Sequence, residues 1–298
     1  RVALKLFAKP GDGIKYRAAL WALKKTLEWD EQHFGLEYPL DEYRLVMVDD
    51  FNAGAMENLG LNTYNTSRTA AHPRTRTDAQ ILEALTVVFH ESAHTWRGNM
   101  VSVKSWHEIA LKEGFATYAE ERHSEDRMGV TARIAKVRKL RGRQFAEDAT
   151  SIAHPILQDE YEGDDPQNRM YTLTTYEKGA EVIGMLETLL GKEGFRKGCD
   201  LYFTENKGKA VTIEDLVAAM EQANGVDLRL FRNWFKQVGT PVCKAESAYD
   251  EAAKTLALTV RQECPREPKL LLHIPLMMGL IGPDGREIPL ELEGDGTA

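Results

Sequence analysis

The ten residues from Val87 to Trp96, VVFHESAHTW, decide the fold of this chain. They contain the pattern His-Glu-x-x-His, with histidines at positions 90 and 94. Residues four apart lie on the same face of an α-helix, one turn above each other. His90 and His94 can therefore bind one zinc ion together, and Glu91 between them flanks the same ion.

The residues around this pattern are typical of a helix. Thr77 and Gln80 can form a capping box at its start, and Gly98 stands where the helix is expected to stop. Apolar side chains recur at intervals of three or four residues, which is the helical period. They are Ile81, Leu82, Leu85, Val88 and Trp96.

A third metal ligand is expected at Glu113, nineteen residues after His94. The segment SWHEIALKEGFA, residues 105–116, predicts a second helix with a capping box between Ser105 and Glu108. A helical hairpin of this length can return Glu113 to the two histidines. Two His and one Glu leave the fourth position of a tetrahedral zinc ion open for water, which is typical of a catalytic site. No cysteine, the usual ligand of a closed structural site, is nearby.

A second motif, NAGAMEN, occupies residues 52–58. Together the two motifs resemble the gluzincin zinc aminopeptidases of the bacterial aminopeptidase N type, which carry Gly-Ala-Met-Glu-Asn followed by His-Glu-x-x-His and a later Glu. The similarity extends over nearly the whole chain. It continues through Gly142–Ala149, Ala153–Ile156, Tyr171–Glu181, Phe231–Trp234 and Gly239–Pro241.

The resemblance implies an α+β fold. A thermolysin-like zinc peptidase domain, mostly helical with a small mixed sheet, is expected at residues 1–239, and a partial β-sandwich at residues 240–298. After residue 239 the apolar period changes to two, and a long apolar run covers Leu270–Ile281. Asp159–Gln167 reads as an acidic loop. Further helices are expected at Val182–Leu190, Phe195–Phe203, Thr212–Ala223 and Leu228–Val238.

The first part of the chain predicts the sheet. Alternating apolar residues indicate strands at Val2–Phe7 and Tyr43–Val48, and helical spacing indicates a helix from residue 16 to 34 that ends at Gly35. In the family it resembles, the segment Gly54–Asn58 lies at the edge of the sheet beside the substrate. An edge strand offers unpaired backbone groups, so a peptide can bind there as an added strand.

Three groups of residues are expected to carry the chemistry. Glu91 is about 100° round the helix from His90 and so off the face of the two histidines, which suits the role of general base rather than that of a ligand. Tyr176 is implied by the resemblance as the donor that stabilises the oxyanion, and Tyr171 is its rival. Zinc is expected on His90, His94 and Glu113.

The substrate is implied to be a peptide with a free amino terminus. Glu57 would bind the α-amino group, while Gly54, Ala55 and Met56 would present backbone to the peptide. Ala53 stands where close bacterial relatives have Met, so the size of the side-chain pocket stays open. Glu108 or Asn99 is a candidate to orient a zinc ligand.

Composition narrows the partners. The chain has 298 residues and a net charge of −8, which argues against a nucleic-acid partner. No apolar run approaches the length of a membrane span. The three cysteines match no zinc framework, so we expect free thiols in a reducing, cytoplasmic compartment.

Three alternatives to an aminopeptidase stay open. The resembled family has a domain before this region, which supplies a second amine-binding Glu, and a closing helical domain after it; neither is expected within these residues. The chain is therefore either an aminopeptidase, an endopeptidase without strict recognition of the amino terminus, or a truncated zinc-binding fragment with little turnover. An epoxide-hydrolysing relative is weaker, since that branch has Gly where this chain has Ala55.

Overall fold

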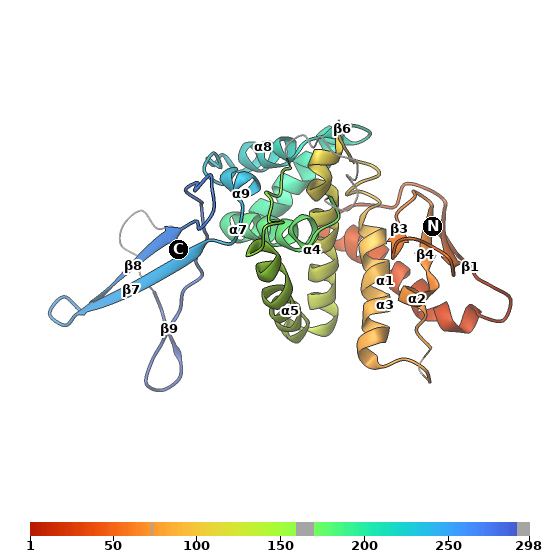
Figure 1. Cartoon of the computed structure of the whole chain (residues 1–298), viewed down its shortest axis with the longest axis horizontal. Coiled ribbons are helices and arrows are strands. Elements are labelled where there is room, and N and C mark those ends of the chain that lie inside the picture. Colours follow the sequence, from red (N-terminus) through yellow and green to blue (C-terminus); the bar gives the residue numbers. More distant parts are fainter. Residues whose placement is uncertain (73, 159–169, 291–298) are drawn as a thin grey trace.

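The computed structural model describes residues 1–72, 74–158 and 170–290. A small sheet with two helices occupies the amino-terminal side, a group of helices forms the centre, and two β-hairpins project at the carboxy-terminal side (Figure 1). The expected acidic loop Asp159–Gln167 lies outside the described residues. Among the described helices, none is long and apolar enough to cross a membrane.

The amino-terminal sheet is mixed, as expected. Its strands are β1 (Ala3–Phe7), β2 (Glu42–Val48), β3 (Ala55–Met56) and β4 (Leu61–Asn65), in the order β1-β2-β4-β3. β1 and β4 run parallel to β2, and β3 is antiparallel to β4. The Gly-Ala-Met-Glu-Asn segment therefore lies at an edge, because β3 has a partner on one side only among the described strands.

Two long helices pack together against this sheet. A 3-10 turn (η1, Gly13–Tyr16) leads into α1 (Arg17–Phe34), which ends at Gly35 in the left-handed conformation with φ of 64°. After the short α2 (Thr66–Thr69) comes α3 (Asp78–Ala93), the helix of the two histidines. Its expected capping box is present, with reciprocal bonds between Thr77 and Gln80. A core of Leu23, Leu45, Tyr64, Val88 and Phe89, among others, joins helices and sheet.

Two local predictions in this region are wrong. α3 ends at Ala93 rather than near Gly98, because the amide of Thr95 bonds with the Ser92 carbonyl and the chain begins to turn. Ser105 makes no capping bond. Its expected partner, Glu108, instead accepts a hydrogen bond from the amide of Ile213, 105 residues away. Glu108 therefore caps a distant helix and does not orient a zinc ligand.

The centre is built from helices that cross one another. After β5 (Ser102–Val103) and a 3-10 turn (η2, Trp106–Glu108) come α4 (Ile109–Met128) and α5 (Val130–Asp148). A π-helical turn (η3, Thr174–Lys178) continues into α7 (Gly179–Asn206), which is interrupted at Gly191. They are followed by β6 (Ala210–Val211), α8 (Ile213–Asn224) and α9 (Asn233–Lys236).

The helix expected at Leu228–Val238 is mostly wrong, since only Asn233–Lys236 is helical. The Glu221 carboxylate accepts a hydrogen bond from the amide of Leu228, and Gly225 ends α8 in the left-handed conformation. The segment therefore begins as a turn and not as a helix.

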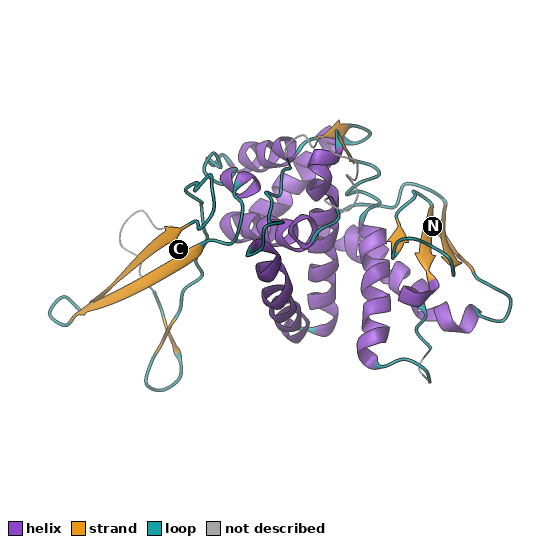
Figure 2. Cartoon of the chain, viewed as in Figure 1, coloured by secondary structure: helices purple, strands orange, loops and turns teal. Residues whose placement is uncertain are grey.

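The carboxy-terminal region consists of two antiparallel hairpins (Figure 2). β7 (Val242–Asp250) pairs with β8 (Thr255–Glu263), and β9 (Leu280–Ile281) pairs with β10 (Glu287–Ile288). Only the end of the apolar run Leu270–Ile281 is a strand. The amide of residue 270 donates a hydrogen bond to the Gln237 side chain, and that of residue 272 donates to Gln262. These amides are therefore unavailable to a neighbouring strand.

Candidate active site

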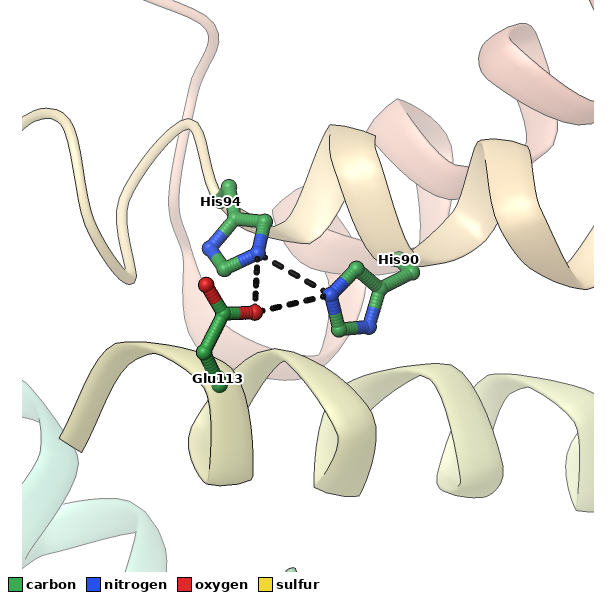
Figure 3. Close-up of side chains that lie close together, drawn as sticks. All are labelled: His90, His94 and Glu113. Carbon is green, nitrogen blue, oxygen red and sulfur yellow. Dashed lines mark hydrogen bonds and ion pairs between the residues drawn. The ribbon is translucent and has the colours of Figure 1, made fainter. Parts of the chain in front are cut away.

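The three expected zinc ligands converge at the contact between α3 and α4 (Figure 3). The Nε2 atoms of His90 and His94 are 3.0 Å apart. The Glu113 Oε2 atom lies 3.2 Å from each of them. The helical period places the histidines on one face of α3, although His94 follows the last helical residue, and α4 brings Glu113 against that face.

Hydrogen bonds on the far side of each ring orient the two imidazoles. The His94 Nδ1 atom lies 2.9 Å from the carbonyl oxygen of Arg97, which can only accept, so Nδ1 carries the proton and Nε2 a free lone pair. The His90 Nδ1 atom lies 3.5 Å from the Glu120 carboxylate. The sequence reasoning missed Glu120, although it stands seven residues after Glu113 and therefore on the same face of α4.

The geometry fits a tetrahedral zinc ion. With metal–ligand bonds of about 2.0–2.1 Å, the donor atoms of a tetrahedral site are separated by about 3.3 Å. The distances of 3.0–3.2 Å between the three donors are close to this value. Burial by itself lowers the pKa of His90, but hydrogen bonds to Glu113 and Glu120 outweigh it and raise the pKa to about 10. The site therefore favours a positive charge where the three donors meet.

Glu91 lies beside this cluster. Glu91 forms a second group with Glu57 and His94. One carboxylate oxygen from each glutamate and one ring nitrogen of His94 all lie within 4.8 Å of one another. Glu91 is 8% exposed, and burial raises the pKa of its carboxyl to about 7. A carboxyl group with a pKa near neutrality can both accept and release a proton at physiological pH.

Glu57 is held from two sides at the end of β3. The Asn99 side chain donates to its carbonyl oxygen at 2.7 Å, and the Lys112 ammonium lies 2.6 Å from its Oε1. Lys112 also lies 2.7 Å from the Glu113 Oε1 atom. Sequence reasoning missed Lys112. The one sequence feature that could have indicated a place near the site is its position directly before Glu113. Asn99 therefore holds the backbone at the end of β3 rather than a zinc ligand.

The rest of the edge segment is anchored by Asn65. The amide of Asn65 donates to the carbonyl of Gly54 at 2.9 Å, and its side chain donates to the carbonyl of Ala53 at 3.3 Å. Ala55 and Met56 form β3, and the Met56 side chain is 40% exposed. Among the described strands β3 pairs with β4 only, so its outer edge offers unpaired backbone groups to an added strand.

Of the two tyrosines, Tyr176 lies nearer the cluster. Its ring centroid is 5.8 Å from that of His90. Burial, followed by the negative charge of Glu113, raises the pKa of its phenol, which therefore stays protonated and able to donate. Tyr171 is 47% exposed, and its ring is 6.3 Å from that of Tyr176.

Comparisons with known proteins identify the family of this chain. Residues 18–235 match the Peptidase family M1 domain, and residues 239–295 match a domain of unknown function (DUF3458) with an Ig-like fold. Aminopeptidase N of Haemophilus influenzae is 46% identical over 300 residues, which cover 99% of this chain and 34% of that protein. Aminopeptidase N of Escherichia coli is 44% identical over 299 residues, with shares of 98% and 34%.

A solved structure shows the same fold. The crystal structure of Legionella pneumophila aminopeptidase A in complex with aspartic acid matches with a TM-score of 0.83 and 32% identity, over 95% of this chain and 31% of that one. The chain thus spans about a third of the length of these relatives. Because the family match covers most of the chain and includes all three converging ligands, this chain belongs to peptidase family M1.

Proposed function

We propose that this chain is the catalytic part of a zinc-dependent aminopeptidase that hydrolyses the amino-terminal bond of peptides. One observation carries the proposal. Two imidazole nitrogens and a carboxylate oxygen lie 3.0–3.2 Å apart, and beside them Glu91 has a carboxyl group with a pKa near neutrality. The naming of the similar proteins as aminopeptidases supports it.

His90, His94 and Glu113 would hold the ion. A bound zinc ion would polarise the scissile carbonyl and make an attacking water more acidic. Glu91 would take the proton of that water and pass it to the leaving amine, for which a pKa of about 7 is well suited. Tyr176 would donate to the developing oxyanion, and Tyr171 is the less favoured candidate because it is more exposed.

Glu57 would bind the α-amino group of the substrate. Its Oε1 atom already pairs with Lys112, which leaves the other oxygen to meet a substrate ammonium. Gly54, Ala55 and Met56 would align the peptide along the open edge of β3. Ala53 would influence the size of the side-chain pocket.

We also propose a division into a catalytic domain at residues 1–239 and part of an Ig-like domain at residues 240–298. The ranges of the two family matches support it. The three cysteines are free, which supports a reducing, cytoplasmic location.

The test compares an amino-acyl arylamide with its N-acetylated form. We expect hydrolysis of the free-amine substrate only, loss of activity with a chelator, and recovery with added zinc. Equal hydrolysis of both substrates would point to an endopeptidase without amine recognition. Zinc bound at one equivalent with no turnover of either substrate would point to a metal-binding fragment.

A further inference from the structure

Several sequence motifs that have no role in the proposed peptide hydrolysis lie close together around Tyr176. Tyr176 lies in the π-helical turn η3, Thr174–Lys178, between a loop and the long helix α7. A π-helical turn is rare and is frequently found at functional sites. Two of the motifs that are shared with the resembled family, at 142–149 and 239–241, supply side chains or carbonyls that bond to this turn. A third, at 153–156, bonds to Thr172 just before it.

Glu147, near the end of α5, holds the start of the turn. Its Oε1 atom accepts hydrogen bonds from the amide of Thr174 at 2.8 Å and from its hydroxyl at 2.7 Å. Its Oε2 atom accepts from the amide of Leu173 at 3.2 Å. The first amides of a helix have no partner within it, so one carboxylate satisfies two of these donors with two different oxygens.

Asp148, the next residue, holds the other end of the turn. Its Oδ2 atom accepts from the Lys178 ammonium at 3.0 Å and from the Thr240 hydroxyl at 2.8 Å. The same ammonium donates to the carbonyl of Gly239 at 2.9 Å. Asp148 and Lys178 are 2% and 7% exposed, so this contact is shielded from water and resists rearrangement.

A third contact holds Thr172, whose carbonyl accepts a hydrogen bond from the amide of Tyr176. The His154 Nδ1 atom lies 2.7 Å from the Pro155 carbonyl and so carries the proton, which leaves Nε2 to accept from the Thr172 hydroxyl at 2.8 Å. The Thr172 carbonyl accepts the amide of Tyr176 at 3.1 Å.

We infer that Glu147 and Asp148 form a positioning pair that fixes Tyr176 relative to the His90–His94–Glu113 cluster. Glu147 accepts hydrogen bonds at the start of the five-residue turn, and Asp148 pairs with Lys178 at its end. Through Thr240 and Gly239 it also ties that turn to the junction with the Ig-like region. Neither carboxylate touches the reacting atoms, so each acts through Tyr176, and the inference rests on the proposed function. A displacement of about 1 Å at such a site can cost about 10²-fold in rate.

The test uses Glu147→Gln, Asp148→Asn and Thr240→Val in the full 298-residue chain. In Glu147→Gln, an NH₂ group faces one of the two amides at the start of the turn. We expect kcat to fall about 10-fold with KM within about twofold, because the tyrosine contact belongs to the transition state. Thr240→Val, which removes one bond, should change kcat in the same direction by less.

A matched control is Glu221→Gln on α8. Glu221 also accepts a backbone amide, that of Leu228 at 2.6 Å, and pairs with Arg232 at 2.8 Å, but it does not contact the turn. We expect Glu221→Gln to lower thermal stability while kcat stays unchanged. A fall in kcat equal to that of Glu147→Gln would show that general destabilisation explains both, and would overturn the inference.

Two readouts separate positioning from stability. Tyr176→Phe should cost much less in a Glu147→Gln background than in the parent, because both changes remove the same contact; full additivity would overturn the inference. Hydrogen exchange of the amides at 171–179 should become at least about 10-fold faster in Glu147→Gln and Asp148→Asn, with zinc content unchanged.

The exchange measurement does not depend on turnover. If the zinc-loaded parent hydrolyses no substrate, the proposed function fails, and the exchange rates still show whether the pair holds the turn. Unchanged exchange in both variants would overturn the inference even if the parent is active.

Discussion

At the scale of single residues, Glu91 and Glu113 show one side chain in two environments. Burial raises the pKa of Glu91 to about 7. Burial also acts on Glu113, but the two histidines and Lys112 outweigh it and hold its pKa well below the usual range. One carboxyl is therefore suited to exchange protons, and the other stays ionised.

This contrast predicts different outcomes for the same substitution. Glu91→Gln should keep its zinc while turnover falls by roughly 10²–10⁴-fold, because the base is lost and the ligands remain. Glu113→Gln should lose zinc, since an amide is a poorer ligand. Elemental analysis beside arylamide hydrolysis checks both. Zinc loss in Glu91→Gln with retention in Glu113→Gln would reverse the two roles.

Tyr176 predicts a second difference at this scale. Tyr176→Phe should lower kcat by about 10²-fold or more, as for a lost oxyanion donor, with little change in KM. Tyr171→Phe is the matched comparison, because its ring stands beside that of Tyr176 but is more exposed. Steady-state kinetics of both variants decide the assignment, and equal effects would leave Tyr176 without a special role.

At the scale of elements, α4 and α7 approach closely at two glycines. A Cβ atom on Gly114 would lie 2.9 Å from the carbonyl carbon of Gly179. Gly114→Ala should therefore push α4 away from α7, lower the free energy of unfolding by about 1–3 kcal/mol, and weaken zinc binding through the neighbouring Glu113. Urea unfolding and metal titration measure these effects.

The control for this change is Gly142→Ala in α5. A Cβ atom there meets nothing within 4 Å, so the substitution should stabilise the helix by up to about 1 kcal/mol. If both variants lost the same stability, close packing of α4 on α7 would not be the cause.

His123 predicts how the contact of α4 with its neighbours depends on pH. Its ring packs against Trp29 and Phe89, and burial, with help from Arg127, lowers its pKa from 6.5 to about 3. Below about pH 6.5 the unfolded chain binds a proton that the folded chain does not. The His123 contribution is therefore complete above pH 6.5 and is lost as the pH falls toward 3, by up to about 1.4 kcal/mol per pH unit.

Urea unfolding of the metal-free protein between pH 7 and pH 4 tests this contribution. The variant His123→Gln, which stays neutral, should lose less stability over this range than the parent. Parallel curves for the two proteins would show that His123 does not contribute to the acid sensitivity.

At the scale of the whole molecule, the β7–β8 hairpin projects away from the helices (Figure 2). Leu256 and Leu258 are each 44% exposed and Val260 is 37% exposed, all on one face of β8. A two-stranded hairpin with an open apolar face and unpaired edges promotes association.

We therefore expect the 298-residue chain to self-associate as its concentration rises. Leu258→Lys should reduce association, because it places a charge in the centre of the apolar face. Thr259→Lys, on the opposite face, is the control for added charge alone. Sedimentation velocity measures all three proteins, and a parent that stays monomeric would contradict the expectation.

Local patterns predicted much of the framework. The capping box at Thr77 and the stop of α1 at Gly35 follow from neighbouring residues, and the structure confirms both. Two of the errors share a cause. The apolar residues of Leu228–Val238 and Leu270–Ile281 suit a helix and a strand, but the side chains of Glu221, Gln237 and Gln262 accept hydrogen bonds from backbone amides in these segments.

By itself, the sequence determined the zinc-ligand prediction, because the spacing of His90 and His94 translates directly into one helical face. Only the tertiary structure decided what surrounds those ligands. Glu120 and Lys112 of α4 contact His90 of α3 and Glu57 after β3. Glu147 and Asp148 of α5 bond to the π-helical turn that carries Tyr176. The physical reason is that helical periodicity records which face of a helix is buried, but not which residues of another helix meet it.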